Sequence, residues 1–167
     1  FNLDEFQFLA GHSLGEYSAL VCSESLKFGD ALYLLHERGK FMQEAVPVGK
    51  GNMIAVLGTD LSTINDLLKS INNEEGVCEI ANDNATGQII LSGDKNKVDY
   101  FKTILKKNNI KSIPLKVSAP FHCSLMKPAA EKMREKIDNV TFNKPSKNIV
   151  SNVTAQSESD PKKIKNL

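Results

Sequence analysis

A pentapeptide near the start of the chain limits what the surrounding sequence can fold into. It reads Gly11-His12-Ser13-Leu14-Gly15 and fits the pattern G-x-S-x-G. The short apolar run 7–10 precedes it, as a buried strand would, and apolar residues at helical spacing follow it. The two glycines allow a sharp turn from strand to helix that exposes the serine. The pattern therefore predicts a nucleophile elbow, with an ordinary turn serine as the alternative interpretation.

Composition narrows the class of protein further. The chain has 167 residues, 41% of them hydrophobic and 25% charged, and its formal net charge is +1. These values are typical of globular proteins, and they include no charge excess that favours nucleic acid. No apolar run approaches the roughly 20 residues that a membrane span requires. Cys22, Cys78 and Cys123 form no C-x-x-C pair, so we expect neither a metal site nor a disulfide framework.

The spacing of apolar residues predicts an α/β protein with one inserted subdomain. Further helices are expected at residues 30–44, 61–71, 98–105 and 124–137, and strands at residues 53–57, 77–81, 88–92, 112–117 and 148–152. The turn-rich segment 82–87 is expected to connect two strands, and Asp160-Pro161 predicts a helix start. Residues 52–117 then have the order βαββαβ, a ferredoxin-like subdomain. Residues 1–51 and 118–167 form the discontinuous α/β core, whose parallel sheet carries the elbow.

A serine nucleophile needs a base, and the histidines are the first candidates. His122 lies on a loop directly after a strand of the outer domain, where α/β active sites gather. A structural histidine is the alternative. His12 adjoins the serine and is expected to point away from it, whereas His36 falls within a helical pattern.

Two further groups fit a site around Ser13. The amide of Leu14, at a helix N-terminus, is placed to donate to an oxyanion. Arg38 lies among apolar residues on the second predicted helix, where a guanidinium needs an anionic partner such as a substrate carboxylate. A solvated surface arginine is the alternative.

Five segments, in order along nearly the whole chain, together resemble the malonyl-CoA:acyl carrier protein transacylases. They are AGHSLGEYSAL at 10–20, RGKFMQ at 38–43, ANDN at 81–84 with GQ at 87–88 and SG at 92–93, APFH at 119–122, and SNV at 151–153. These are the malonyltransferases of fatty-acid synthesis, related to acyltransferase domains of polyketide synthases. The resemblance implies an α/β-hydrolase-like acyltransferase core with the ferredoxin-like insertion.

The resemblance also implies a mechanism. Ser13 would take the malonyl group from malonyl-CoA, with His122 as general base, and pass it to the phosphopantetheine thiol of acyl carrier protein. This is ping-pong transfer through a malonyl-serine ester. Arg38 would pair with the free malonate carboxylate, and Phe121 and Met42 would line the substrate site.

Other expectations follow from the same resemblance. Asn82 and Asn84 would be groove residues, and the partners would be malonyl-CoA and acyl carrier protein, with no cofactor, metal, nucleic acid or membrane. We expect a monomer that is located in the cytoplasm, and a location in an organelle is the alternative. The family's Gly-Gln-Gly-rich loop and its C-terminal segment with a glutamine near the histidine are not found here. We therefore expect part of a longer protein with one oxyanion donor missing, a loss of about 10²–10³ in rate.

Two other functions compete with this interpretation. An α/β-hydrolase would draw an acid from Asp83, Asp94 or Asp99, although these lie in the inserted subdomain. A fragment that only binds carrier protein would use a lysine face that includes Lys111 and Lys116. A preference for malonyl-CoA over neutral esters distinguishes the transferase from the hydrolase.

Overall fold

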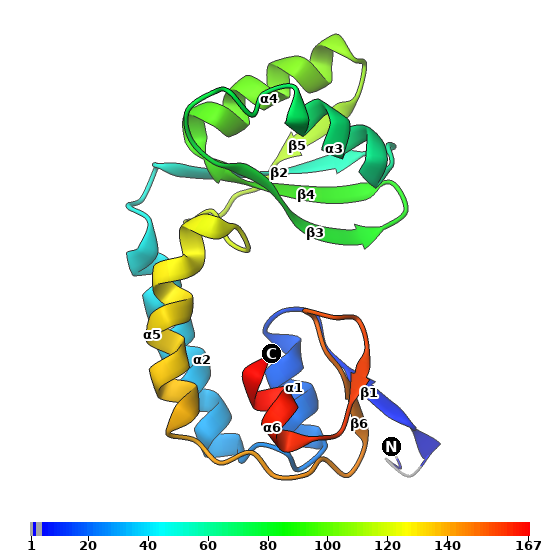
Figure 1. The fold of residues 1–167 in the computed structure, drawn as a ribbon, viewed down its shortest axis with the longest axis vertical. Coiled ribbons are helices and arrows are strands. Elements are labelled where there is room, and N and C mark those ends of the chain that lie inside the picture. The colour runs from blue at the N-terminus through cyan, green and yellow to red at the C-terminus, as the bar shows by residue number, and fades with distance from the viewer. Residues whose placement is uncertain (1, 3–4) are drawn as a thin grey trace. The chain divides into compact units, whose positions relative to one another are not determined.

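A computed structural model describes residues 2 and 5–167, which form two compact units (Figure 1). The first unit contains the chain up to Gly39 together with Lys132–Leu167, and the second is Lys40–Glu131. The chain passes from one unit to the other inside helices α2 (Phe28–Ala45) and α5 (Lys127–Asp138). The second unit thus includes segments on both sides of residues 52–117, and the domain boundaries given above stay a prediction.

The first unit is built on a small mixed sheet in the order β1-β6-β7. β1 (Phe8–Ala10) and β6 (Asn148–Val150) are parallel, with Leu9 opposite Ile149, and β7 (Ser157–Glu158) is antiparallel to β6. β6 ends two residues earlier than predicted, and β7 was not predicted. Because β1 and β6 are parallel neighbours, the segments that follow them leave the sheet at the same edge.

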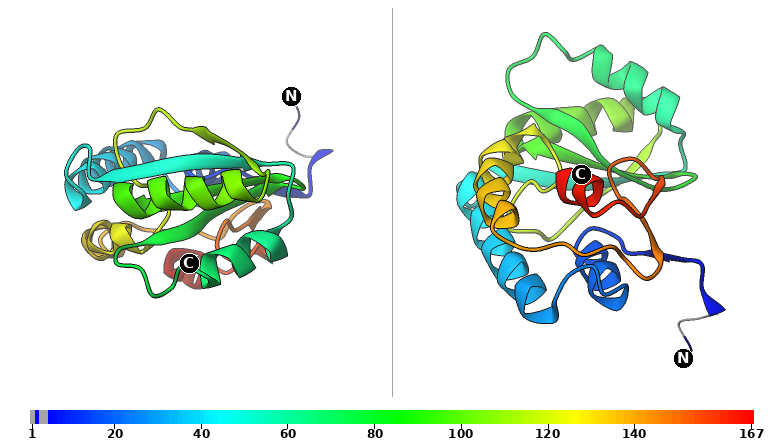
Figure 2. Two further views of the ribbon diagram at one scale, coloured as in Figure 1. Left: turned by 90° about the horizontal axis from the view of Figure 1, so that it is seen from above. Right: turned by 60° about the horizontal axis from the view of Figure 1, so that its bottom comes forward.

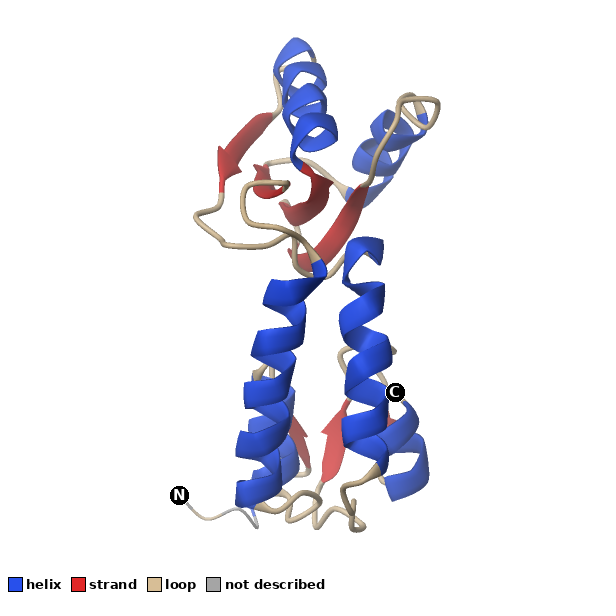
Figure 3. Cartoon of the chain, turned by 90° about the vertical axis from the view of Figure 1, so that its left-hand side faces the viewer, coloured by secondary structure: helices blue, strands red, loops and turns tan. Residues whose placement is uncertain are grey.

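Helices complete the first unit. α1 (Gly15–Cys22) follows β1, and α6 (Pro161–Asn166) begins where Asp160 was expected to start it, since the Asp160 carboxylate accepts from the Lys162 amide. Parts of α2 and α5 run side by side (Figure 3), joined by an ion pair of 3.3 Å between Glu37 and Lys136.

The second unit contains the predicted βαββαβ order. Its elements are β2 (Gly51–Leu57), α3 (Leu61–Lys69), β3 (Cys78–Ala85), β4 (Gln88–Asp94), α4 (Lys95–Lys107) and β5 (Lys111–Pro114). All neighbouring strands are antiparallel, in the order β3-β4-β2-β5. This is the ferredoxin-like arrangement, and Figure 2 shows both helices on one face of the sheet. The α/β fold class predicted from the sequence is therefore confirmed.

The two faces of this sheet bury different sets of side chains. Alternate residues of β2 and β4 point to opposite faces. The helix-covered face holds Ile54, Val56, Ile64, Ile71, Ile89, Leu91, Val98, Phe101 and Leu105. The other face holds Met53, Ala55 and Ile90, with Phe121 packed against them.

Among the strands of the second unit, β3 and β5 end farthest from their predicted positions. β3 continues to Ala85, so most of the segment expected to be a turn is strand, with register shifts between Ile80 and Asn82 and between Asp83 and Ala85. The pairing with β4 outweighs the turn preference of these residues, and the bulges absorb the mismatch. β5 is an edge strand that ends at Pro114, earlier than predicted, and the Leu115 amide still donates to the Met53 carbonyl of β2 at 2.9 Å.

Candidate functional site

The segment 11–15, called the serine turn below, has the geometry of a nucleophile elbow. β1 ends at Ala10 and α1 begins at Gly15, so the reversal takes only a few residues. A Cβ added to Gly11 would lie 2.0 Å from the carbonyl carbon and oxygen of Gly15, a distance that excludes any side chain. Ser13 has φ 53°, in the left-handed region that non-glycine residues seldom occupy. The sharp turn that the G-x-S-x-G pattern predicts is present.

The hydrogen bonds of the serine turn use the amides on both sides of Leu14 but not the Leu14 amide itself. The amides of Gly15, Glu16 and Tyr17 donate to the carbonyls of residues 12, 13 and 14 at 2.9–3.2 Å. The Ser13 amide donates to Oδ1 of Asn152 at 2.9 Å. The Leu14 amide, directly after the serine, is not used by these bonds. This arrangement agrees with its expected role as an oxyanion donor, which remains a prediction.

Arg38 lies beside the predicted nucleophile. Its Nη2 donates a hydrogen bond of 2.9 Å to Oγ of Ser13, across 25 positions of sequence. Both residues are half-buried. Burial raises the pKa of the Tyr17 phenol, and the charge of Arg38 acts in the opposite direction. The first unit thus brings together two of the residues singled out by sequence.

His122 lies in the second unit, in the segment 118–124 called the histidine loop below. His122 is half-buried and has φ 59°, again in the left-handed region. The preceding Pro120 is buried against Gly51, where an added Cβ would lie 2.3 Å from the proline ring. Phe121 packs on the face of the sheet that the helices do not cover, against Met53, Ala55 and Ile90. Apolar contacts on both sides of the loop therefore fix the backbone that carries the imidazole.

Polar contacts hold the end of the histidine loop. The amide and the hydroxyl of Ser124 each donate to the Glu79 carboxylate of β3, both at 2.7 Å. Sγ of Cys123 donates to the Pro120 carbonyl at 3.2 Å, and burial raises the pKa of this thiol. The proton transfer expected between Ser13 and His122 remains a prediction.

The other predicted site residues lie on three elements. Met42 is half-buried on α2, while on β3 Asn82 is half-buried and Asn84 is exposed. Asn82 and Asn84 occupy a strand rather than the expected loop. Their roles toward substrate, and that of Phe121, remain predictions.

Two of the three acids that a hydrolase could use are engaged elsewhere in the second unit, and the third, Asp83, is exposed on β3. Asp94 accepts from the Val77 amide at 2.7 Å. Asp99 accepts from Lys95 at 2.6 Å and from Lys102 at 3.2 Å. In the described part of the chain, no group of three or more His, Cys, Asp or Glu side chains is placed to hold a metal ion.

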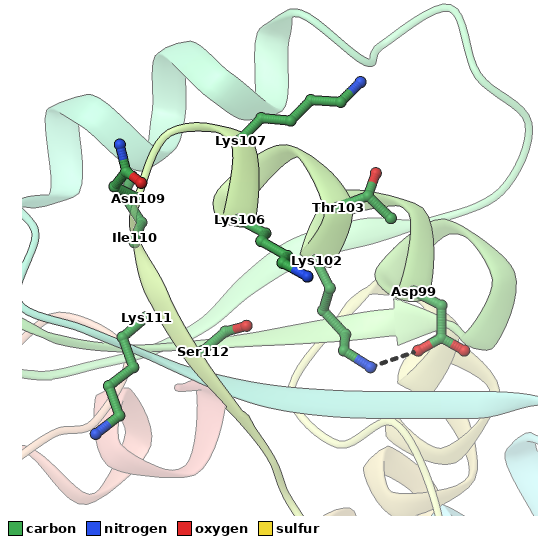
Figure 4. A pocket seen from close by; sticks show the side chains of 9 residues that line it. All are labelled: Asp99, Lys102, Thr103, Lys106, Lys107, Asn109, Ile110, Lys111 and Ser112. Atoms are coloured by element: carbon green, nitrogen blue, oxygen red, sulfur yellow. Dashed lines mark hydrogen bonds and ion pairs between the residues drawn. The ribbon is translucent and has the colours of Figure 1, made fainter.

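A basic groove of about 1030 Å³ lies between α4 and the edge strand β5 (Figure 4). Lys102, Lys106, Lys107 and Lys111 line it, against the single carboxylate of Asp99. Of the two lysines named above for carrier protein binding, Lys111 lines this groove and Lys116 does not.

Sequence reasoning missed the contribution of Asn152 and Glu16 to the serine turn. Asn152 entered only as part of a motif, and Glu16 as a residue of α1. A positional signal was available, since Asn152 is the last residue of the strand expected at 148–152, which was assigned to the parallel sheet. Side chains at the carboxyl ends of neighbouring parallel strands come close together.

Comparisons with known proteins agree with this fold. The model of the acyl transferase domain family matches residues 6–166. Malonyl CoA-acyl carrier protein transacylase from Bacillus subtilis is 44% identical over 159 residues, which are 95% of this chain and 50% of the relative. The same-named protein from Salmonella typhimurium is 43% identical over 158 residues, covering 94% and 51%. The chain spans about half the length of these curated relatives.

Solved structures extend the comparison. FabD from Acinetobacter baumannii matches with a TM-score of 0.92 and 41% identity, covering 96% of this chain and 51% of that one. A chain of the solved complex between a type II PKS acyl-carrier protein and its malonyl-transacylase matches with a TM-score of 0.91 and 38% identity. The match covers 96% of this chain and 52% of that one.

An α/β unit that carries the serine turn, together with a ferredoxin-like unit, gives this chain the fold of the matched FabD structure over 96% of its length. The chain belongs to the acyl transferase domain family. Within the described residues, no helix is long and apolar enough to cross a membrane.

Proposed function

We propose that this chain carries the nucleophile and the carboxylate-binding group of a malonyl-CoA:acyl carrier protein transacylase. The observation that supports this most directly is the 2.9 Å hydrogen bond between Arg38 Nη2 and Ser13 Oγ. In a malonyl ester of Ser13, the free carboxylate is separated from the ester oxygen only by a methylene and the carbonyl. The Arg38 guanidinium is therefore close enough to pair with it.

The reaction proceeds in two transfers. Oγ of Ser13 attacks the malonyl thioester, its proton moves to His122, and the carbon–sulfur bond breaks as CoA leaves with a proton. The phosphopantetheine thiol of the carrier protein then attacks the ester. The new carbon–sulfur bond forms, the carbon–Oγ bond breaks, and the proton returns to Ser13. The Leu14 amide donates to the oxyanion in both steps.

Substrate choice follows from the charge of Arg38. A malonyl group supplies an anion to the guanidinium, whereas an acetyl group leaves this cation without a partner in the site. A site built for a polar group rejects analogues that lack it much more strongly than a site that only loses contact area. Malonyl-CoA and holo acyl carrier protein are then both substrates, and no resident cofactor takes part. The partner assignment is supported by the names of the relatives and by the carrier-protein complex.

The direct test is incubation with malonyl-CoA, followed by intact-mass measurement and peptide mapping. We expect one malonyl adduct, on Ser13, that is absent from Ser13→Ala and discharged by holo carrier protein. Arg38→Ala should lower malonyl transfer at least about a hundredfold while raising the relative use of acetyl-CoA. His36→Ala, an exposed residue on the same helix, is the matched control.

Three outcomes would contradict the proposal. These are a malonyl adduct at another residue, an unchanged malonyl preference in Arg38→Ala, and hydrolysis of neutral esters without preference for malonyl-CoA. A protein of full family length, assayed beside this chain, shows how much of the rate depends on additional segments.

A further inference from the structure

We infer that Asn152 and Glu16 form a positioning pair, called the amide clamp below, that holds Ser13 in its left-handed conformation. The inference rests on the proposed role of Ser13 as nucleophile. Neither residue needs to touch substrate. Their function is to fix the backbone from which Oγ is presented.

The Asn152 carboxamide bridges the serine turn. Its Oδ1 accepts from the Ser13 amide at 2.9 Å, and its Nδ2 donates to the Gly11 carbonyl at 2.7 Å. One planar group therefore binds the backbone on both sides of His12. Since the donor and the acceptor of a carboxamide have a fixed separation, these two bonds together define the path of the turn.

Glu16 fixes the orientation of that carboxamide. Its Oε2 accepts from Asn152 Nδ2 at 2.6 Å and from the Asn152 amide at 3.3 Å. An ionised carboxylate only accepts hydrogen bonds, so the NH₂ side of Asn152 must face it. The oxygen is then directed toward Ser13. A flipped carboxamide would set its oxygen against both the Glu16 carboxylate and the Gly11 carbonyl.

The fold explains why residues so distant in sequence meet here. β1 and β6 are parallel neighbours, with Ala10 opposite Val150. The chain after β1 enters the serine turn, and the chain after β6 reaches Asn152 within two residues. Glu16 lies in the first turn of α1, on the segment that continues from Ser13. The clamp thus ties the turn to the neighbouring strand through side chains.

A set of four variants tests the clamp. Asn152→Ala removes it, and Asn152→Asp replaces the donor by an oxygen that faces Glu16. Glu16→Gln removes the charge, and the double variant Glu16→Gln/Asn152→Asp restores one donor–acceptor pair between the two side chains. Asn139→Ala is the control, because Asn139 is exposed in the same unit and only donates to the Glu135 carbonyl. Asn152 is also exposed, so these changes leave the core intact.

The first readout is kinetic. Asn152→Ala and Asn152→Asp should lower the rate constant for acylation of Ser13 by roughly tenfold to a hundredfold, with the half-saturating malonyl-CoA concentration unchanged. The double variant should be several-fold faster than Asn152→Asp alone, and Asn139→Ala should match the parent chain. A purely structural role would not give rescue by an exchanged pair. Equal rates in all variants, or a double variant no faster than Asn152→Asp, would overturn the inference.

The second readout does not depend on activity. The NMR signal and hydrogen exchange of the Ser13 amide report its bond to Asn152 directly. We expect slow exchange in the parent chain and in Asn139→Ala, and exchange at least about tenfold faster in Asn152→Ala. Equal exchange rates would refute the clamp even if Ser13 acylates normally. If the parent chain forms no malonyl adduct, the proposed function fails while this measurement still decides the inference.

Discussion

The serine turn and the histidine loop each hold one polar residue in a left-handed backbone conformation, but they do so through different interactions. Each presents a polar residue, Ser13 or His122, from the left-handed region of the backbone, at φ 53° and 59°. The serine turn is held by backbone contact at Gly11 and by the Asn152 carboxamide. The histidine loop is held mainly by Pro120 against Gly51 and by Phe121 on the sheet.

This difference has a mechanical consequence. Backbone atoms and a planar amide allow almost no adjustment, so Oγ of Ser13 has a fixed position. Packed rings and aliphatic groups can shift by small amounts without losing all of their contacts. We therefore expect a substitution in the serine turn to have a large effect on acylation, and a substitution in the histidine loop to have a smaller effect.

The largest effect should come from Gly11→Ala. The new methyl group would meet the carbonyl of Gly15 at 2.0 Å, so the turn must open or α1 must move. Either movement displaces Ser13 Oγ, and we expect acylation to fall at least about a hundredfold. The measurement is the rate of malonyl adduct formation, beside circular dichroism to verify folding.

Gly29→Ala is the control for this variant. Gly29 lies in α2, and apart from its own stretch of helix no atom is within 4 Å of an added Cβ, so this variant should leave acylation unchanged. A Gly11→Ala chain that acylates at the parent rate would show that the turn tolerates adjustment. The contrast between the two regions would then be wrong.

A smaller effect is expected for Gly51→Ala. Its methyl group would meet the Pro120 ring at 2.3 Å, and the histidine loop has to shift to relieve the overlap. Overpacking of this kind lowers the free energy of unfolding by about 1–3 kcal/mol, and urea titration measures it.

The double variant Gly51→Ala/Pro120→Ala identifies the cause. With the ring removed, the added methyl group has space, so the double variant should lose less stability than the sum of the two single changes. Additive losses would mean that Gly51 matters for the strand β2 rather than for the loop.

The sequence predicted most of the fold because its periodicities were clear. The apolar stripes of α3 and α4 and the short apolar runs of β2 and β4 predicted the ferredoxin-like order directly. The predictions failed where pairing between strands decided the outcome. Residues 82–85 have turn-forming side chains, yet β4 supplies a ladder that keeps them extended.

The candidate site was predicted in part for a related reason. Ser13 belongs to a local pattern, and Arg38 could be singled out as a cation in apolar surroundings. Asn152 has only its place at the end of an expected strand, and its role depends on the pairing of β1 with β6 and on a carboxylate 136 positions away. A single sequence does not state which strands become neighbours, so residues that act across them are the hardest to predict.

The smallest effect is a difference in thiol reactivity between the two units. Cys22 is exposed on α1, whereas burial raises the pKa of Cys123 in the histidine loop and raises that of Cys78 on β3 to about 12. A raised pKa keeps the thiol protonated until the pH passes that higher value, and only the thiolate reacts. Near pH 8 we expect iodoacetamide to modify Cys22 first and Cys78 last.

Peptide mapping over time measures the order of modification, and Cys22→Ser should remove the fast phase alone. Raising the pH toward 10 should accelerate modification of Cys123, since burial raises the pKa of its thiol and the thiolate forms only at higher pH. If Cys123 reacts as fast as Cys22 near pH 8, the contacts around Pro120 and Phe121 do not shield the loop. The histidine loop would then lack the packing that distinguishes it from the serine turn.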